Sequence, residues 1–220
     1  MATAAEIDDA LTRTFHPALI EVGFERVDRR RWVRSTRLPI RDVFEMGSLK
    51  SGTLTPIWGV SLDFVPHVSG SRDVRWHRTA KTARFDLRFD PVDSFERNTP
   101  EAEAWSVFPP FEPVAVVTKA LTNLAKLAIP EALRFWSRLT TVADVPEAIR
   151  QKKERPTVRF GFENYVQEPL AEAFVSAALG DARAVGLLDA YVSRYEVDPQ
   201  AAAQLRSRLG DLLASRPAPP

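Results

Sequence analysis

The 220-residue sequence contains no cysteine, three histidines and only nine glycines. Without thiols the chain cannot form disulfides, zinc–thiolate sites, iron–sulfur ligands or a cysteine nucleophile. The phosphate loops GxxxxGK[ST] and GxGxxG are absent, as are HExxH, GxSxG and an EF-hand pattern. These absences indicate neither a metal nor an organic cofactor, and they favour a protein without catalytic activity.

The sequence also lacks an excess of either charge. Thirty basic residues face 29 acidic ones, whereas a non-specific nucleic-acid binder usually carries a clearly basic domain. No apolar run approaches the roughly 18 residues of a membrane helix, and the first residues lack the pattern of a signal peptide. We therefore expect a cytoplasmic protein with no membrane partner. The oligomeric state is left open.

What is present begins with a helical pattern. Apolar residues recur at three- and four-residue spacing from Ile7 to Val22, and Gly23 occupies the position of a helix-ending glycine. Pro17 falls inside this pattern and lacks the backbone donor that a helix interior requires. We predict a helix over 7–22 with a kink or a restart at Pro17.

Residues 24–90 show the two-residue period of β-strands. In "PIWGVSLDFVP" and "ARFDLRFD", large apolar residues alternate with small or charged ones. Such alternation favours an antiparallel sheet that is covered on one face and solvated on the other. Strands are predicted over 24–27, 31–35, 40–49, 56–66 and 83–90.

Beyond Glu101 the apolar period becomes helical. The fold class is therefore α+β: an N-terminal helix packed on a mostly antiparallel sheet, followed by a helical C-terminal part. Helices are predicted over 113–128, from Pro130, after Asp144, and over 168–179, 182–195 and 199–214. The domain prediction is an α+β core over 1–140, a linker with a last strand (157–162) over 141–165, a helical subdomain over 166–215 and a loose tail over 216–220.

Residues 10–66 resemble the bacterial family catalogued as domain of unknown function 4304. The resemblance is carried by a helix-ending "VGF" followed by "RWVRS" and "IWGVSLDFVP". The matching positions are Val22, Gly23, Phe24, Trp32, Arg34, Trp58 and Gly59. Because that family has no assigned activity, the resemblance implies an α+β fold and transfers no catalytic residue.

Four charged residues are predicted on the solvated face of the sheet. They either form cross-strand ion pairs or line a surface for an anionic ligand, because guanidinium groups match carboxylates and phosphates. Gly59 and Ser61, predicted on the same face, would leave room for such a ligand. The four residues are Asp63, Arg84, Asp86 and Arg88.

Two histidines bracket the loop "HVSGSRDVRWH". His67 and His77, with Asp63 or Asp73 beside them, would suit a divalent metal or acid–base chemistry. This is the enzyme hypothesis. The alternative is that they are exposed loop histidines without a function.

The segment "GFERVDRRRWVRSTRLPIRD" holds seven arginines and one tryptophan. Together with "SRDVRWHR" it gives a nucleic-acid hypothesis, in which arginines meet phosphates and tryptophans stack on bases. The alternative is solvated charge on a sheet. The residues concerned are Arg29, Arg30, Arg31, Trp32, Arg34, Arg75, Trp76 and Arg78.

The aromatic residues Trp105, Phe108 and Phe111 lie close together in the sequence, around two prolines. They either cap the core or form a patch that docks a protein. The sequence as a whole favours a non-catalytic interaction or binding module, with another protein as its partner. The alternatives are a small-anion or metal-dependent enzyme at the His67–His77 loop, and nucleic-acid binding.

Overall fold

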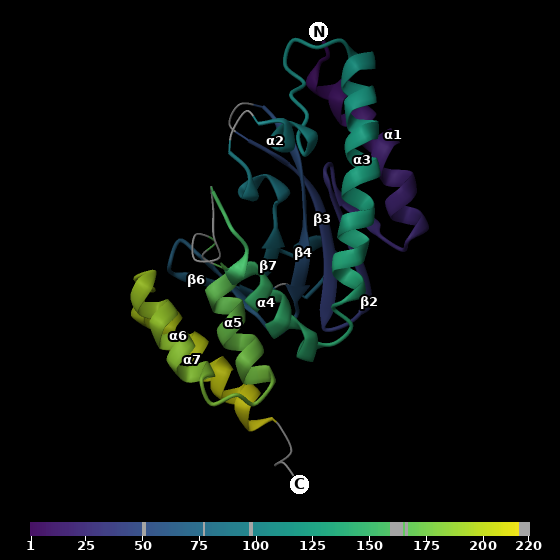
Figure 1. The fold of residues 1–220 in the computed structure, drawn as a ribbon. Helices are drawn as coiled ribbons and strands as arrows, with labels where there is room; N and C mark the ends of the chain where they lie inside the picture. The colour runs from purple at the N-terminus through teal and green to yellow at the C-terminus, as the bar shows by residue number, and fades with distance from the viewer. Residues whose placement is uncertain (50–51, 77, 97–98, 159–164, 166, 216–220) are drawn as a thin grey trace.

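The computed structural model describes residues 1–49, 52–76, 78–96, 99–158, 165 and 167–215. Helix α1 (Ala4–Glu21) precedes an antiparallel sheet, and helices dominate the second half of the chain (Figure 1). The predicted α+β class is confirmed. No helix in the described part of the chain has both the length and the apolar character needed to cross a membrane.

The main sheet has five strands in the order β1-β2-β3-β4-β7, and every neighbouring pair is antiparallel. A separate hairpin, β5–β6, follows β4. The strands are β1 (Glu25–Asp28), β2 (Arg31–Arg37), β3 (Ile40–Ser48), β4 (Leu54–Leu62), β5 (Pro66–Ser69), β6 (Asp73–Trp76) and β7 (Leu87–Phe89).

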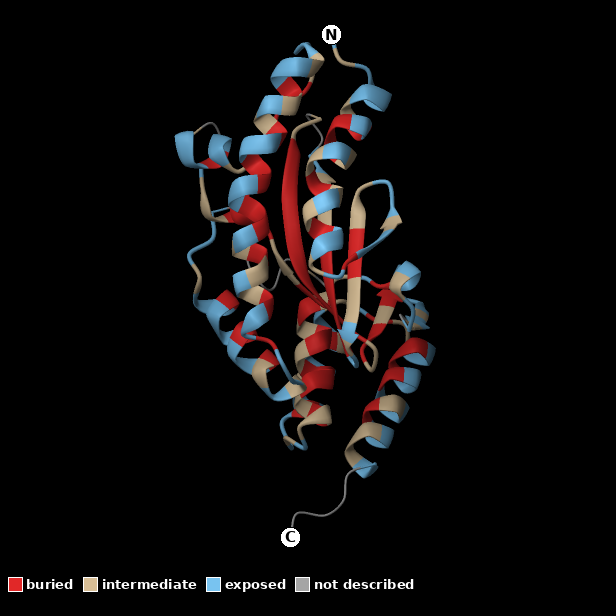
Figure 2. Cartoon of the chain, turned by 90° about the vertical axis from the view of Figure 1, so that its right-hand side faces the viewer, coloured by how far each residue is buried: buried red, intermediate tan, exposed pale blue. Residues whose placement is uncertain are grey.

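A row of aromatic side chains crosses one face of the sheet. The register pairs Trp32 with Phe44, Phe44 with Trp58, and Trp58 with Phe89, so all four share a face. Helices α1 and α3 (Val114–Ser137) lie side by side over this face (Figures 1 and 2). The row ends at Phe89 on the edge strand β7.

Both long helices run through a proline. Pro17 lies inside α1 and Pro130 inside α3, whereas we expected a kink or restart at the first and a new helix at the second. A proline removes one backbone hydrogen bond and costs about 3 kcal/mol. Apolar faces on both sides of each proline are buried in the core and hold each helix together.

The second face of the sheet is not solvated as predicted. Residues 80–85, which include η1 (Ala80–Thr82), fold back over it, and Ala83 packs against Val33 and Val43. Strand β4 is buried along its whole length (Figure 2). The predicted strand 83–90 is correspondingly reduced to β7.

Gly59 marks the closest approach on this face. A Cβ atom at Gly59 would lie 2.0 Å from the carbonyl oxygen of Leu87 and 3.0 Å from a ring carbon of Phe85. The room that we attributed to Gly59 and Ser61 is therefore filled by the chain itself. Glycine is required here by packing between strands.

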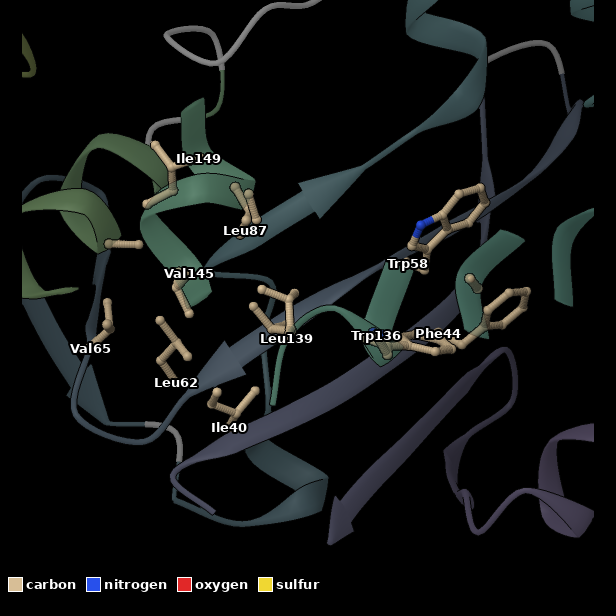
Figure 3. Close-up of a cluster of buried hydrophobic side chains, with 14 of the residues drawn as sticks. Ile40, Phe44, Trp58, Leu62, Val65, Leu87, Trp136, Leu139, Val145 and Ile149 are labelled. Carbon is tan, nitrogen blue, oxygen red and sulfur yellow. The ribbon is translucent and has the colours of Figure 1, made fainter. Parts of the chain in front are cut away.

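The C-terminal helices match their predicted ranges closely. They are α4 (Val145–Glu154), α5 (Gln167–Ala178), α6 (Ala184–Arg194) and α7 (Pro199–Ala214). Part of the predicted linker packs into the core, because Val145 and Ile149 of α4 are buried in the same hydrophobic cluster as Leu62 of β4 and Leu87 of β7 (Figure 3). Thr157 and Val158 form no strand; the rest of the predicted strand 157–162, and the tail 216–220, lie outside the described residues.

Candidate ligand-binding cavity

A cavity of about 490 Å³ lies where the aromatic row reaches the β7 edge. Ligand pockets typically have volumes of about 300–1,000 Å³. Short elements frame it: η2 (Pro91–Ser94), α2 (Pro100–Ala104) and η3 (Val142–Asp144). Its lining residues are Trp58, Phe89, Pro91, Phe95, Trp105, Glu131, Arg134, Phe135, Arg138, Leu139, Asp144, Glu147, Ala148, Gln151 and Arg155.

Two tilted aromatic pairs line the cavity. The ring centroids of Trp58 and Trp105 are 6.0 Å apart, and those of Phe89 and Phe135 are 4.4 Å apart. Trp105 is placed by α2, which begins after the capping hydroxyl of Thr99 and ends at Trp105 itself. Such surfaces bind flat apolar groups through burial and ring stacking.

The carboxylates of the lining all have partners within the protein. Glu131 pairs with Arg134 at 2.6 Å, and Glu147 pairs with Arg150 at 2.5 Å. Because of its hydrogen bonds from Arg150, the pKa of Glu147 falls to about 2. Asp144 is the third lining carboxylate.

Asp144 caps the turn that precedes α4. It accepts hydrogen bonds from the backbone N–H groups of Thr140 and Thr141 at 2.9 and 2.7 Å and also from both hydroxyls. These bonds lower the pKa of Asp144. The donors of the turn therefore stabilise the negative charge of Asp144.

Two of the three lining arginines are different. Arg138 and Arg155 make no ion pair or hydrogen bond through their side chains within the described residues. Arg155 is half-buried, and burial lowers the pKa of its guanidinium. An arginine stays protonated even so, and the cavity thus carries two positive charges that the described chain does not neutralise.

A buried polar network lies on the far side of Phe89. Lys152 Nζ contacts the Glu168 carboxylate and donates to the Arg88 carbonyl, while the Arg88 N–H donates to Glu168 Oε1 at 2.9 Å. The Tyr165 hydroxyl donates to Asp93 at 2.5 Å, and the Arg88 guanidinium lies 4.9 Å from the Tyr165 ring centroid. These contacts hold α4 and α5 against β7.

Burial dominates the electrostatics of this network. It raises the pKa of Glu168 to about 7 and lowers that of Lys152, in spite of their attraction for each other. Burial likewise raises the pKa of Asp93 and of Tyr165. None of these groups lines the cavity, so we assign the network a structural role in positioning α4.

The four predicted anion-binding residues differ in their partners and burial. Asp63 pairs with Arg41 at 3.1 Å, Arg88 pairs with Asp90 at 3.0 Å, and Arg84 is exposed. Asp86 was expected in solvent but is completely buried. The Asp86 N–H donates to the Val60 carbonyl of β4 at 2.8 Å, and Gln167 at the start of α5 contacts its carboxyl group.

Asp86 is a buried carboxyl group without a cation beside it. Its oxygens accept from the Leu62 N–H at 2.6 Å and from Gln167 Nε2 at 2.6 Å. Burial nevertheless raises its pKa to about 8. Asp86 is therefore largely protonated at neutral pH and joins the end of β4 to the start of α5.

His67 is hydrogen-bonded to Gln167, the residue that also contacts Asp86. Gln167 Nε2 also donates to the Pro66 carbonyl at 2.8 Å, so its Oε1 accepts from His67 Nδ1, at 3.1 Å. Burial lowers the pKa of His67. His77 lies outside the described residues, and within the described ones no group of three His, Asp or Glu side chains is arranged to hold a metal ion.

The arginine-rich segment is held by internal partners. Arg29 and Arg30 both pair with Asp8 of α1, at 2.5 and 2.7 Å. Arg31 pairs with Glu45 at 2.5 Å. Trp32, which the nucleic-acid hypothesis stacked on bases, is completely buried, and its Nε1 donates to His16.

The rest of the segment is held at a buried carboxylate. Arg34 and Arg37 both pair with Asp42, at 2.7 and 2.6 Å. Arg37 also donates to the carbonyls of Trp136 and Leu139, at 2.9 and 2.6 Å, and so caps the end of α3. Arginines of this segment therefore connect the sheet to α1, through Asp8, and to the C-terminal end of α3.

The second basic segment shows a similar pattern. Arg75 lies 3.4 Å from Asp73, and the guanidinium groups of Arg78 and Arg208 lie 5.5 and 5.2 Å from the Trp76 ring centroid. The Trp76 ring is therefore already in contact with two cations. Arg29 and Arg75 nevertheless remain largely exposed, and nucleic-acid binding by these segments stays a prediction.

The predicted aromatic patch is divided. Trp105 lines the cavity, whereas Phe108 and Phe111 are 52% and 78% exposed. Phe111 also has a φ of 70°, which is unfavourable for a residue with a side chain. Docking of a protein on these two rings stays a prediction.

The sequence reasoning did not identify Phe135, Arg138 or Arg155 as site residues. The aromatic cluster around Trp105 was a partial signal, but Arg138 follows α3 without other basic residues beside it, and Arg155 lies in the charged run "RQKKERP", which has the composition of a linker. Their role depends on which carboxylates fold next to them, and no local pattern contains that information.

No family model, curated protein or solved structure matches this chain. The resemblance of residues 10–66 to domain of unknown function 4304 thus stays a prediction, and no function can be taken from relatives.

Proposed function

We propose that this protein is a non-catalytic binding module that holds a small organic ligand in the cavity at the β7 edge. One observation carries the proposal: a cavity of about 490 Å³, lined by two aromatic pairs, lies at the β7 end of the aromatic row, beside the C-terminal part of α3. A pocket with mostly apolar walls and a few polar groups is the usual form of a ligand site.

The nature of the lining supports binding over catalysis. Among its described residues there is no histidine, lysine, serine, threonine or tyrosine, so no common nucleophile or imidazole base faces the cavity. The three lining carboxylates are occupied by ion pairs or by a capping turn. These features favour a site that holds its ligand unchanged.

The test is titration with the uncharged dye N-phenyl-1-naphthylamine, whose fluorescence rises in apolar surroundings. We expect saturable binding to the wild type and at least about tenfold weaker binding to Trp105→Ala, because the ring surface and its stacking are lost. Phe108→Ala is the matched control, since Phe108 is exposed and does not line the cavity.

Absence of saturable binding to the wild type would contradict the proposal. Equal affinity of the wild type and Trp105→Ala would contradict it as well. Loss of binding in Phe108→Ala instead would place the dye on the exposed phenylalanines, outside the cavity.

A further inference from the structure

We infer that the cavity selects a flat, mainly apolar ring compound that carries an acidic group, either a carboxylate or a phosphate. The inference rests on the proposed binding function and adds the chemistry of the ligand. It comes from a comparison of the charged groups that face the cavity with the partners that each of them already has.

The three carboxylates that line the cavity already have hydrogen-bonding or ionic partners in the protein. Glu131 and Glu147 are each held by an arginine, and Asp144 is held by four hydrogen bonds from one turn. Each of these carboxylates is already partly stabilised by a donor, so it gains less from a further cation than a carboxylate without a partner would. The lining therefore offers little attraction to a cation.

Two of the arginines that line the cavity differ from the carboxylates in this respect. Arg138 and Arg155 have no hydrogen-bonding or ionic partner within the described residues, although both line the cavity. Arg138 follows the last residue of α3, where a basic side chain often neutralises the helix carbonyls. Here Arg37 already donates to the carbonyls of Trp136 and Leu139, so Arg138 is not needed for that purpose.

Arg155 gives the stronger indication. Its guanidinium is half-buried, and removal of a cation from water without a partner is unfavourable. The acidic groups Asp90 and Asp93 lie near enough to stabilise it partly but form no ion pair with it. An anionic group on the ligand would supply hydrogen-bond acceptors that the described residues do not provide, since the guanidinium fork fits carboxylate and phosphate oxygens.

The aromatic pairs define the rest of the ligand. Trp58 with Trp105, and Phe89 with Phe135, present tilted ring surfaces beside these two arginines. A flat ring can stack on such surfaces while its acidic group reaches Arg138 or Arg155. An aliphatic acid would leave the ring faces unused, and an inorganic anion would leave the apolar walls wet.

The experiment compares two dyes with the same ring skeleton. The sulfonate dye, 8-anilinonaphthalene-1-sulfonate, is N-phenyl-1-naphthylamine with one acidic group added. We expect the wild type to bind the sulfonate dye at least about tenfold more tightly than the uncharged dye, which corresponds to one charge-assisted contact.

Arginine variants locate that preference. At least one of the variants Arg138→Gln and Arg155→Gln should weaken sulfonate-dye binding by about tenfold, and neither should change uncharged-dye binding by more than about twofold. Arg206→Gln is the control, because it removes the same charge from an exposed arginine that pairs with Asp189 on another helix. It should change neither affinity.

Displacement of the sulfonate dye then separates the two acidic groups. Competition by naphthalene-1-carboxylate would favour a carboxylate ligand, and competition by 1-naphthyl phosphate would favour a phosphate ligand. Failure of both to compete would overturn the inference.

The inference and the proposed function fail separately. If both dyes bind the cavity with equal affinity and the two arginine variants behave like the wild type, the selection of an acid is wrong and the cavity remains a binding site. If neither dye binds saturably, both proposals are wrong.

Discussion

Two groups of arginines in this protein are used in opposite ways. In the segment Gly23–Asp42, Arg30 and Arg34 are tied to carboxylates of α1 and β3, at 2.7 Å in both cases. At the rim of the cavity, Arg138 and Arg155 have no such partner within the described residues. The dense group is held by contacts within the fold, and we propose that the sparse group binds a ligand.

The difference shows that the number of arginines in a segment does not predict how many of them lack partners in the fold. Asp8 lies 22 residues before Arg30 in the sequence and reaches it only because α1 packs on the sheet. A count of arginines along the sequence therefore overestimates the binding capacity of the first group. It also gives no sign of the second.

The largest effect is expected from a substitution that removes ion pairs of the first group. Asp42→Asn leaves Arg34 and Arg37 facing a neutral amide in a largely buried place, and we expect the free energy of unfolding to fall by about 3 kcal/mol. Urea unfolding monitored by circular dichroism measures this change. Asp73→Asn breaks an exposed pair and should cost less than about 1 kcal/mol. Equal effects of the two variants would contradict the structural role of the first group.

The second prediction concerns Asp86, a buried carboxyl group that forms no ion pair within the described residues, and the dependence of stability on pH. The pKa of Asp86 rises from 3.8 to about 8 on folding, so between these values the native state holds a proton that the unfolded state has lost. The wild type should therefore lose stability as the pH rises through this range. The loss approaches about 1 kcal/mol per pH unit.

Asp86→Asn removes the titrating group and should remove this contribution to the slope. Unfolding free energies measured in urea from about pH 5 to about pH 8 provide the test. Asp211→Asn, at an exposed position on α7, should keep the slope of the wild type. A slope that is the same in the wild type and Asp86→Asn would show that Asp86 is ionised in the native state.

The smallest effect is expected from a substitution that removes the ionic partner of an arginine in the cavity lining. Glu131→Gln releases Arg134, the third arginine of the cavity lining. Binding of the sulfonate dye should become about two- to fivefold tighter, while binding of the uncharged dye stays the same. Fluorescence titration of both dyes measures the change. Weaker binding of the sulfonate dye would argue against anion selection by free arginines.

Local patterns predicted the elements well. The apolar period of Ile7–Val22 predicted α1, and the alternation in "PIWGVSLDFVP" predicted β4 within a few residues. The last three helices also lie close to their predicted ranges. These predictions succeeded because periodicity and capping are properties of neighbouring residues.

The predictions failed where distant segments decide the outcome. Asp86 was placed in solvent because the sequence cannot show that residues 80–85 cover the sheet and that α5 covers Asp86. Pro130 was taken as a helix start, although core packing on both sides keeps α3 continuous. The candidate site was hidden for the same reason, since its arginines are defined by partners that they lack.

The most direct test of the account is thermal unfolding of the wild type and of Arg138→Gln/Arg155→Gln, each with and without saturating sulfonate dye. Without dye we predict that the double variant unfolds at or above the midpoint of the wild type. With dye we predict a rise of several degrees in the wild type and a clearly smaller rise in the double variant, because a ligand stabilises the state that binds it in proportion to its affinity. A double variant that unfolds well below the wild type without dye would show that these arginines serve the fold. An equal rise in both proteins would show that they do not select an anion.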